Sequence, residues 1–141
     1  MTKEELKERT KKFALVIIKL VEELPNTNVG RTISNQIIRS GTSVAANYRA
    51  ACRARSNADF ISKINIVEEE CDETLFWLEV IVESNLLKKE KLLYLLKEAD
   101  ELTAIFTASG KTARQNNPNC SLAKQKSPIR NHHNCVIISI T

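Results

Sequence analysis

Apolar residues recur at intervals of three and four positions through most of this chain, and few residues interrupt them. Ile33, Ile37, Gly41, Val44 and Tyr48 are one example. Such spacing places side chains on a single face of a helix. A fold built from short strands needs frequent turn residues, whereas the 141 residues include only three Gly and three Pro. The pattern therefore predicts long amphipathic helices.

Helix-start and helix-stop signals divide the pattern into four parts. Thr2 and Glu5 match a capping box, and Ser56 is a candidate N-cap. Pro25 ends the first stretch, and Gly110 is a candidate C-cap of the last. The predicted helices span residues 2–24, 29–55, 57–84 and 88–109.

Short connections between helices of this length are typical of an antiparallel up-and-down four-helix bundle, which is the all-α fold we expect for residues 1–112. Residues 113–141 lose the periodicity and are rich in Asn, Ser and basic residues. We expect this segment to be a flexible, disordered basic tail.

Several classes of protein do not fit the sequence. No apolar run approaches the roughly 18 residues of a membrane span, and the first residues lack the apolar core of a signal peptide, so we expect a cytoplasmic protein without a membrane partner. The four Cys show no C-x-x-C spacing. The only histidines, His132 and His133, are adjacent in the tail and cannot supply the Glu-x-x-His pairs of a di-iron bundle. We expect no metal and no cofactor.

The second predicted helix has an unusual composition. Ten of the fifteen residues from Ser40 to Ala54 are Gly, Ala, Ser, Thr or Cys, and its only charges are Arg. Gly41 in mid-helix is about 1 kcal/mol less favourable than Ala, which indicates close approach of a neighbouring backbone. We predict that this helix is enclosed by its own bundle and by a neighbouring subunit, and hence that the chain is a homo-oligomer.

Charge is distributed unevenly along the chain. Residues 26–55 carry five Arg and no acidic residue, whereas residues 56–85 carry one Lys and eight acidic residues. If the second and third helices are antiparallel, Arg39 lies at the height of Glu70 and Glu73, where an ion pair can form. A structural pair that fixes register is favoured over an acid–base pair, because no nucleophile accompanies it. We therefore expect no enzymatic activity.

Three further polar or aromatic residues lie in the same two helices. Ser43 and Asn47 fall within an apolar helix, where structural hydrogen bonding is favoured over ligand binding. Trp77 shares a stripe with Glu70 and Glu73. We expect it to serve packing or an interface rather than base stacking, because the acidic neighbours repel phosphates.

The run "SNQIIRSGTSVAANYRAACRARS" followed by "DFISKINIVEEECDETLFWLEV" resembles proteins related to those encoded in intervening sequences of bacterial 23S rRNA genes. The resemblance covers about residues 5–112. It is carried by Gln36, Arg39, Ser40, Ser43, Ala46, Asn47, Phe60, Lys63, Glu70, Glu73, Trp77 and Leu78. This family is similar to an accessory protein of diversity-generating retroelements. The resemblance implies a ring-like homopentamer of four-helix bundles that binds nucleic acid without catalysis. It also implies structural or interface roles for Gln36 and Ser40.

Five basic residues are candidates for contact with nucleic acid: Arg31, Arg49, Arg53, Arg55 and Lys63. Arg49 and Arg53 are four positions apart and would share a helical face. Clustered cations attract backbone phosphates without reading sequence, so the ligand would be structured RNA or an RNA–DNA intermediate. Cations near a helix C-terminus can instead compensate the helix dipole. An alternative function is a scaffold that docks a protein partner and binds no nucleic acid.

Overall fold

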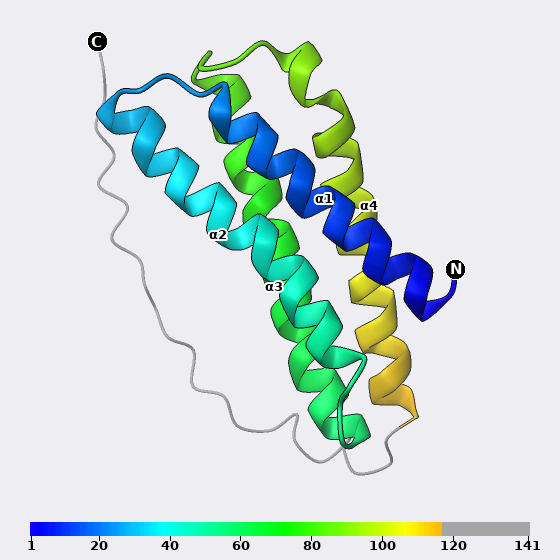
Figure 1. The fold of residues 1–141 in the computed structure, drawn as a ribbon. Helices are drawn as coiled ribbons and strands as arrows, with labels where there is room; N and C mark the ends of the chain where they lie inside the picture. The colour runs from blue at the N-terminus through cyan, green and yellow to red at the C-terminus, as the bar shows by residue number, and fades with distance from the viewer. Residues whose placement is uncertain (117–141) are drawn as a thin grey trace, which may run out of the picture.

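The computed structural model describes residues 1–116, and the segment from residue 117, with His132 and His133, lies outside the described part. The helices are α1 (Lys3–Glu22), α2 (Asn28–Ala51), α3 (Asn57–Glu83) and α4 (Lys89–Gln115). Each helix runs antiparallel to the one before it (Figure 1). Within residues 1–116 there is no strand, so the predicted all-α, up-and-down four-helix arrangement is confirmed.

The predicted helix starts are present in atomic detail. The Glu5 amide donates a 3.1 Å hydrogen bond to the Thr2 hydroxyl, and the Thr2 amide donates to the Glu5 carboxylate at 2.6 Å, which is a complete capping box. At the start of α3, the amide of Asp59 donates to the Ser56 hydroxyl at 3.1 Å. Both caps satisfy amides that would otherwise have no partner in the first helical turn.

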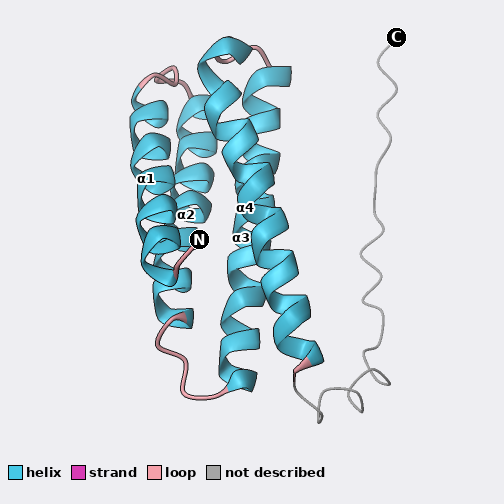
Figure 2. Ribbon diagram, turned by 90° about the vertical axis from the view of Figure 1, so that its right-hand side faces the viewer, coloured by secondary structure: helices cyan, strands magenta, loops and turns pink. Residues whose placement is uncertain are grey.

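The core lies between two helix pairs, α1 with α2 and α3 with α4 (Figure 2). Its largest fully buried side chains are Phe13, Ile17, Ile37, Val44, Ile64, Val67, Leu78, Ile81, Leu92, Leu95, Leu102 and Phe106. Each contributes roughly 1.5–3 kcal/mol through removal from water. Contacts between α1 and α4 are the sparsest of the four seams.

Gly41 of α2 lies against Ile17 of α1. A Cβ atom at this position would lie 3.0 Å from Cγ1 and 3.1 Å from Cγ2 of Ile17. Gly41 therefore makes room for a side chain of the same bundle, whereas the sequence indicated close approach of a neighbouring backbone.

Two predicted helix ends are wrong. Helix α2 ends at Ala51 with Cys52 as its C-cap, not at residue 55. Helix α4 continues through Gly110 to Gln115, past the expected end of the bundle at residue 112. Tertiary contacts explain the longer α4, because the Asn57 side-chain amide donates to the carbonyl of Ala113 at 2.8 Å. Arg114, in the last turn of α4, also donates to the Asn65 side chain of α3 at 2.5 Å.

The small residues of α2 are partly enclosed by the bundle itself. Ser40 and Gly41 are buried, whereas Arg39, Ala46 and Arg49 are exposed. The single chain thus covers two sides of α2, and coverage of the third side by another subunit stays a prediction. A search of residues 1–116 for a helix with the length and apolarity needed to cross a bilayer finds none.

Candidate nucleic-acid interface

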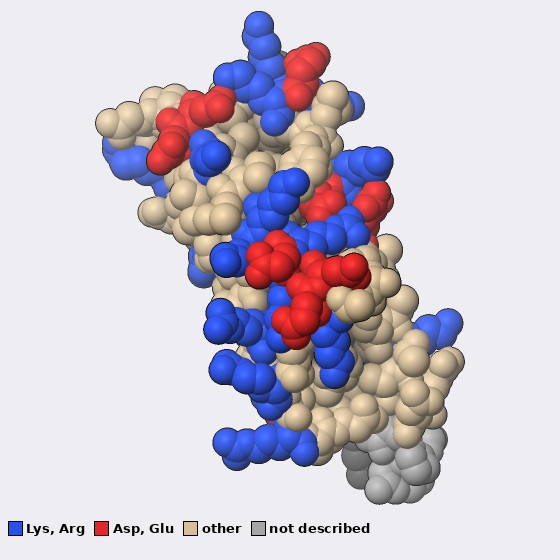
Figure 3. Space-filling model, turned by 45° about the vertical axis from the view of Figure 1, so that its right-hand side comes forward, with Lys and Arg blue, Asp and Glu red and all other residues tan. Residues whose placement is uncertain are grey.

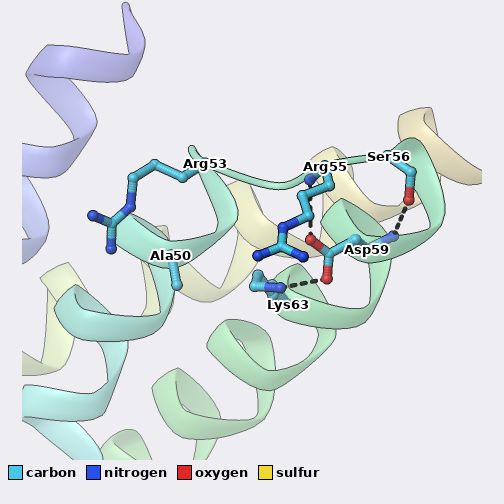
Figure 4. Close-up of a pocket in the computed structure, with 6 residues that line it drawn as sticks. All are labelled: Ala50, Arg53, Arg55, Ser56, Asp59 and Lys63. Carbon is cyan, nitrogen blue, oxygen red and sulfur yellow. Dashed lines mark hydrogen bonds and ion pairs between the residues drawn. The ribbon is translucent and has the colours of Figure 1, made fainter.

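Three of the predicted basic residues line one concavity at the connection between α2 and α3. Arg53, Arg55 and Lys63 surround an open cavity of about 660 Å³, whose other lining residues are Ala50, Ser56 and Asp59. Figure 4 shows the guanidinium of Arg53 on one side, and the guanidinium of Arg55 and the ammonium of Lys63 on the other. We call this concavity the α2–α3 basin.

Backbone hydrogen bonds shape the turn that builds the basin. The amides of Arg53 and Ala54 donate to the carbonyls of Ala50 and Ala51, each at 3.0 Å. The Arg55 amide then donates to Oδ2 of Asp59 at 3.1 Å. This last bond ties the end of the turn to the first turn of α3, so that Arg55 lies close to Lys63.

Among residues 1–116, Asp59 is the one carboxylate that lines the basin. Besides the Arg55 amide, it accepts a hydrogen bond from Nζ of Lys63 through Oδ1. The hydrogen bond from Lys63 is the main reason why the pKa of Asp59 is lowered, and the bond from the Arg55 amide adds to it. Asp59 is therefore ionised at neutral pH, and the basin combines three cations with one anion.

Arg49 lies outside the basin, which corrects the expectation that it shares a helical face with Arg53. Because α2 ends at Ala51, Arg53 belongs to the turn. Arg49 instead lines a groove between α1 and α2 together with Lys7 and Lys11, and also with Glu4 and Glu8. This groove is electrically mixed, since Lys7 pairs with Glu4 at 2.8 Å. Figure 3 shows basic side chains along the lower left edge and acidic ones nearer the middle.

Arg31 lies near the start of α2, far along the helix from the other four candidates. Its guanidinium donates to the side-chain oxygens of Asn26 at 2.9 Å and Asn28 at 2.5 Å. These bonds hold it beside the α1–α2 connection. The five predicted residues therefore occupy three places, and only Arg53, Arg55 and Lys63 are brought together.

The Arg39 guanidinium reaches both carboxylates expected of it. It donates to Glu70 at 3.3 Å and also to Glu73. The Arg39 bond is the main reason why the pKa of Glu73 is lowered, and the Trp77 indole adds to this by donating to the same carboxylate at 3.3 Å. Within residues 1–116 no group of three His, Cys, Asp or Glu is arranged to hold a metal. The geometry is that of a register-fixing ion pair.

The polar residues of α2 differ in what they contact. Ser40 is buried and bonds across the seam to Thr74 of α3, with 2.9 Å between the two hydroxyl oxygens. Asn47 donates to the carbonyl of Ser43 one turn earlier at 2.9 Å, and both residues are half-buried. Gln36 is half-buried on the same helix. Asn47 thus makes the structural hydrogen bond expected of it.

The model of the 23S rRNA-intervening sequence protein family matches residues 2–108. The chain belongs to this family. A search of curated proteins gives no match. A solved structure of a protein of unknown function from the S23 ribosomal protein family of Bacteroides thetaiotaomicron is similar, with a TM-score of 0.70 and 35% sequence identity. That similarity covers 74% of this chain and 97% of the solved one.

The chain also contains a charged cluster that sequence reasoning missed. Arg9 of α1 donates to both oxygens of Glu98 of α4, at 2.6 and 2.8 Å, and to Glu101 at 2.6 Å. The Glu98 side chain is only 9% exposed. No local pattern signals this pair, because its members are 89 positions apart. It closes the sparsely packed seam between α1 and α4.

Proposed function

We propose that this protein is a non-catalytic homo-oligomer that binds nucleic acid through backbone phosphates. The observation that carries the proposal is the α2–α3 basin, a single cavity that Arg53, Arg55 and Lys63 line from a turn and a helix. Arginine and lysine side chains neutralise phosphates and release counterions, which gives affinity without sequence readout. The expected ligand is structured RNA or an RNA–DNA intermediate.

Membership of the family supports the same proposal. Its name associates these proteins with 23S rRNA genes, and the similar solved protein is assigned to a ribosomal protein family. A ring of subunits, most simply a homopentamer, would repeat the basin and strengthen the cationic field. The exposed outer side of α2, with small Ala46 and half-buried Ser43 and Asn47, is a surface on which another subunit can pack closely.

Fluorescence anisotropy with a labelled RNA hairpin over a range of salt concentrations tests the binding. Arg53→Ala should weaken binding and reduce the salt slope by roughly 0.7–0.9 for each basin that contacts the RNA. The matched control is Arg31→Ala, which removes the same charge from the distant end of α2 and should leave the slope unchanged. Equal effects of both variants, or no binding at low salt, contradict the proposal.

Light scattering on the purified protein tests the assembly. A homopentamer should persist at micromolar concentration, with a mass five times that of the 15.9 kDa chain. A stable monomer under these conditions contradicts the oligomeric part of the proposal. Each binding unit would then have a single basin.

The alternative is a scaffold that docks a protein partner. It is favoured by an aromatic pair on α3, in which Phe76 is 52% exposed and forms an edge-to-face contact with half-buried Trp77 at 5.0 Å between ring centroids. Aromatic side chains of this kind are frequent anchors of protein interfaces. A purified particle that captures one protein through Phe76, lacks nucleic acid by its absorbance ratio and is insensitive to Arg53→Ala would favour this function.

A further inference from the structure

The α2–α3 basin contains a feature that a surface built only to attract phosphates would lack. The Asp59 carboxylate lies between Arg55 and Lys63, with its side chain 33% exposed (Figure 4). A carboxylate offers about four positions for accepting hydrogen bonds. Lys63 uses one on Oδ1, and the Arg55 amide uses one on Oδ2. The group therefore keeps accepting capacity beside the cations.

A ligand that suits this arrangement carries an anion and a hydroxyl donor close together. A ribose–phosphate backbone has both, whereas a deoxyribose–phosphate backbone lacks the 2′-hydroxyl. Carboxylates accept hydrogen bonds from ribose 2′-hydroxyls in dinucleotide-binding sites, and contact with this hydroxyl is how proteins distinguish RNA from DNA.

The basin also has room for a sugar between the charged groups. The cavity of about 660 Å³ falls within the roughly 300–1,000 Å³ of small-ligand sites. The methyl group of Ala50 is the smallest side chain that lines it, and it leaves the space between Arg53 and Lys63 open (Figure 4).

We propose that the α2–α3 basin selects RNA over DNA, with Asp59 accepting a hydrogen bond from a ribose 2′-hydroxyl while Arg53 and Arg55 contact the adjoining phosphates. The inference rests on the proposed nucleic-acid binding and adds the class of ligand. It gives Asp59 a specificity role, beyond its part in holding the turn.

The variant Asp59→Asn separates these two roles. Its amide oxygen, at the place of Oδ2, can still accept from the Arg55 amide, so the turn is kept. Its NH₂ group, at the place of Oδ1, is a donor, so a 2′-hydroxyl that binds at Oδ1 loses its acceptor. Loss of the negative charge should strengthen binding of any polyanion. The ratio of RNA to DNA affinity removes this general effect, because both ligands carry the same phosphates.

The experiment measures binding of an oligouridylate and an oligodeoxyuridylate of equal length at one salt concentration. The natural protein should bind the RNA about tenfold more tightly, as one hydrogen bond to a charged group predicts. Asp59→Asn should bring the ratio close to one. The control Asp100→Asn removes an exposed carboxylate of α4 and should keep the tenfold ratio.

A third ligand tests the inference in the natural protein, without relying on a variant. A 2′-fluoro oligouridylate keeps an RNA-like sugar but cannot donate a hydrogen bond, so it should bind as weakly as the DNA. A ratio near one in the natural protein, or a tenfold ratio that survives Asp59→Asn, overturns the RNA selectivity. If both oligonucleotides bind equally and Arg53→Ala weakens both, only the selectivity fails; if neither binds and the RNA hairpin does not bind either, the proposed function fails with it.

Discussion

The hydroxyl of Thr74 on α3 donates a 2.9 Å hydrogen bond to the hydroxyl of Ser40 on α2, inside a seam where both side chains are fully buried. Apolar packing alone tolerates sliding of two helices along each other, since one aliphatic side chain can replace another. A hydrogen bond between two buried hydroxyls has a single best alignment. This pair and the Arg39 ion pair with Glu73, at a similar height, fix the register of α2 against α3.

Removing the Ser40 hydroxyl should destabilise the bundle moderately. The Thr74 oxygen lies 2.7 Å from the carbonyl of Glu70, so its proton keeps a partner in Ser40→Ala. We expect a loss of about 1 kcal/mol in the free energy of unfolding, measured by urea denaturation. Thr74→Val should lower the free energy of unfolding less in the Ser40→Ala background than in the natural protein. Strictly additive losses would show that the two hydroxyls do not interact.

The Arg9–Glu98 pair should contribute more than any exposed ion pair. Arg9→Met keeps the apolar stem but leaves the buried Glu98 carboxylate without its guanidinium, and should lower the free energy of unfolding by about 2–3 kcal/mol. The control is Lys91→Met, which breaks an exposed pair with Glu23 and should cost less than about 1 kcal/mol. Equal losses in the two variants would contradict the importance given to burial.

Local signals account for most of the fold that could be predicted. The capping box of Thr2 and Glu5, the cap at Ser56 and the 3–4 apolar stripes depend on residues a few positions apart, so one sequence is enough to recognise them. The height of Arg39 against Glu73 followed from counting residues on either side of a turn. Such arithmetic works because antiparallel helices have the same rise per residue.

Features that depend on tertiary contacts were not predictable from local patterns. Gly110 suggested a helix end, but contacts of Asn57 and Arg114 with the neighbouring helix extend α4 beyond it. Arg49 and Arg53 are one turn apart only if the helix continues, and α2 ends between them. Composition therefore located the basic region, whereas the grouping of its side chains depends on where the backbone turns.

Acid should weaken the α2–α3 seam through Glu73. The pKa of Glu73 is lowered in the folded chain, chiefly by the Arg39 bond, from an ordinary value of about 4.5. The folded state then binds fewer protons than the unfolded state, so this stabilisation is complete above the ordinary pKa and is lost as the pH falls through the folded one.

Urea denaturation at a series of pH values checks this effect. Glu73→Gln should be less stable than the natural protein at neutral pH, and the two should converge as the pH falls below 4.5 and through the lowered pKa of folded Glu73. The control Glu69→Gln changes an exposed carboxylate of the same helix. Its free energy of unfolding should change with pH in the same way as that of the natural protein. If the difference in the free energy of unfolding between Glu73→Gln and the natural protein stayed constant across this pH range, ionisation of Glu73 would not be involved.

Gly41→Ala tests how closely α1 and α2 approach. In a free helix Ala is about 1 kcal/mol more favourable than Gly, but here the new methyl group would lie 3.0 Å from Cγ1 of Ile17. Overpacking in a well-packed core costs about 1–3 kcal/mol, so we expect a net loss of about 1 kcal/mol in the free energy of unfolding. In an Ile17→Ala background the obstructing atoms are gone, and the same change should become stabilising. Chemical denaturation of the four proteins of this cycle measures the reversal of sign, and Gly41→Ala having the same sign in both backgrounds would show that Ile17 does not require glycine at this position.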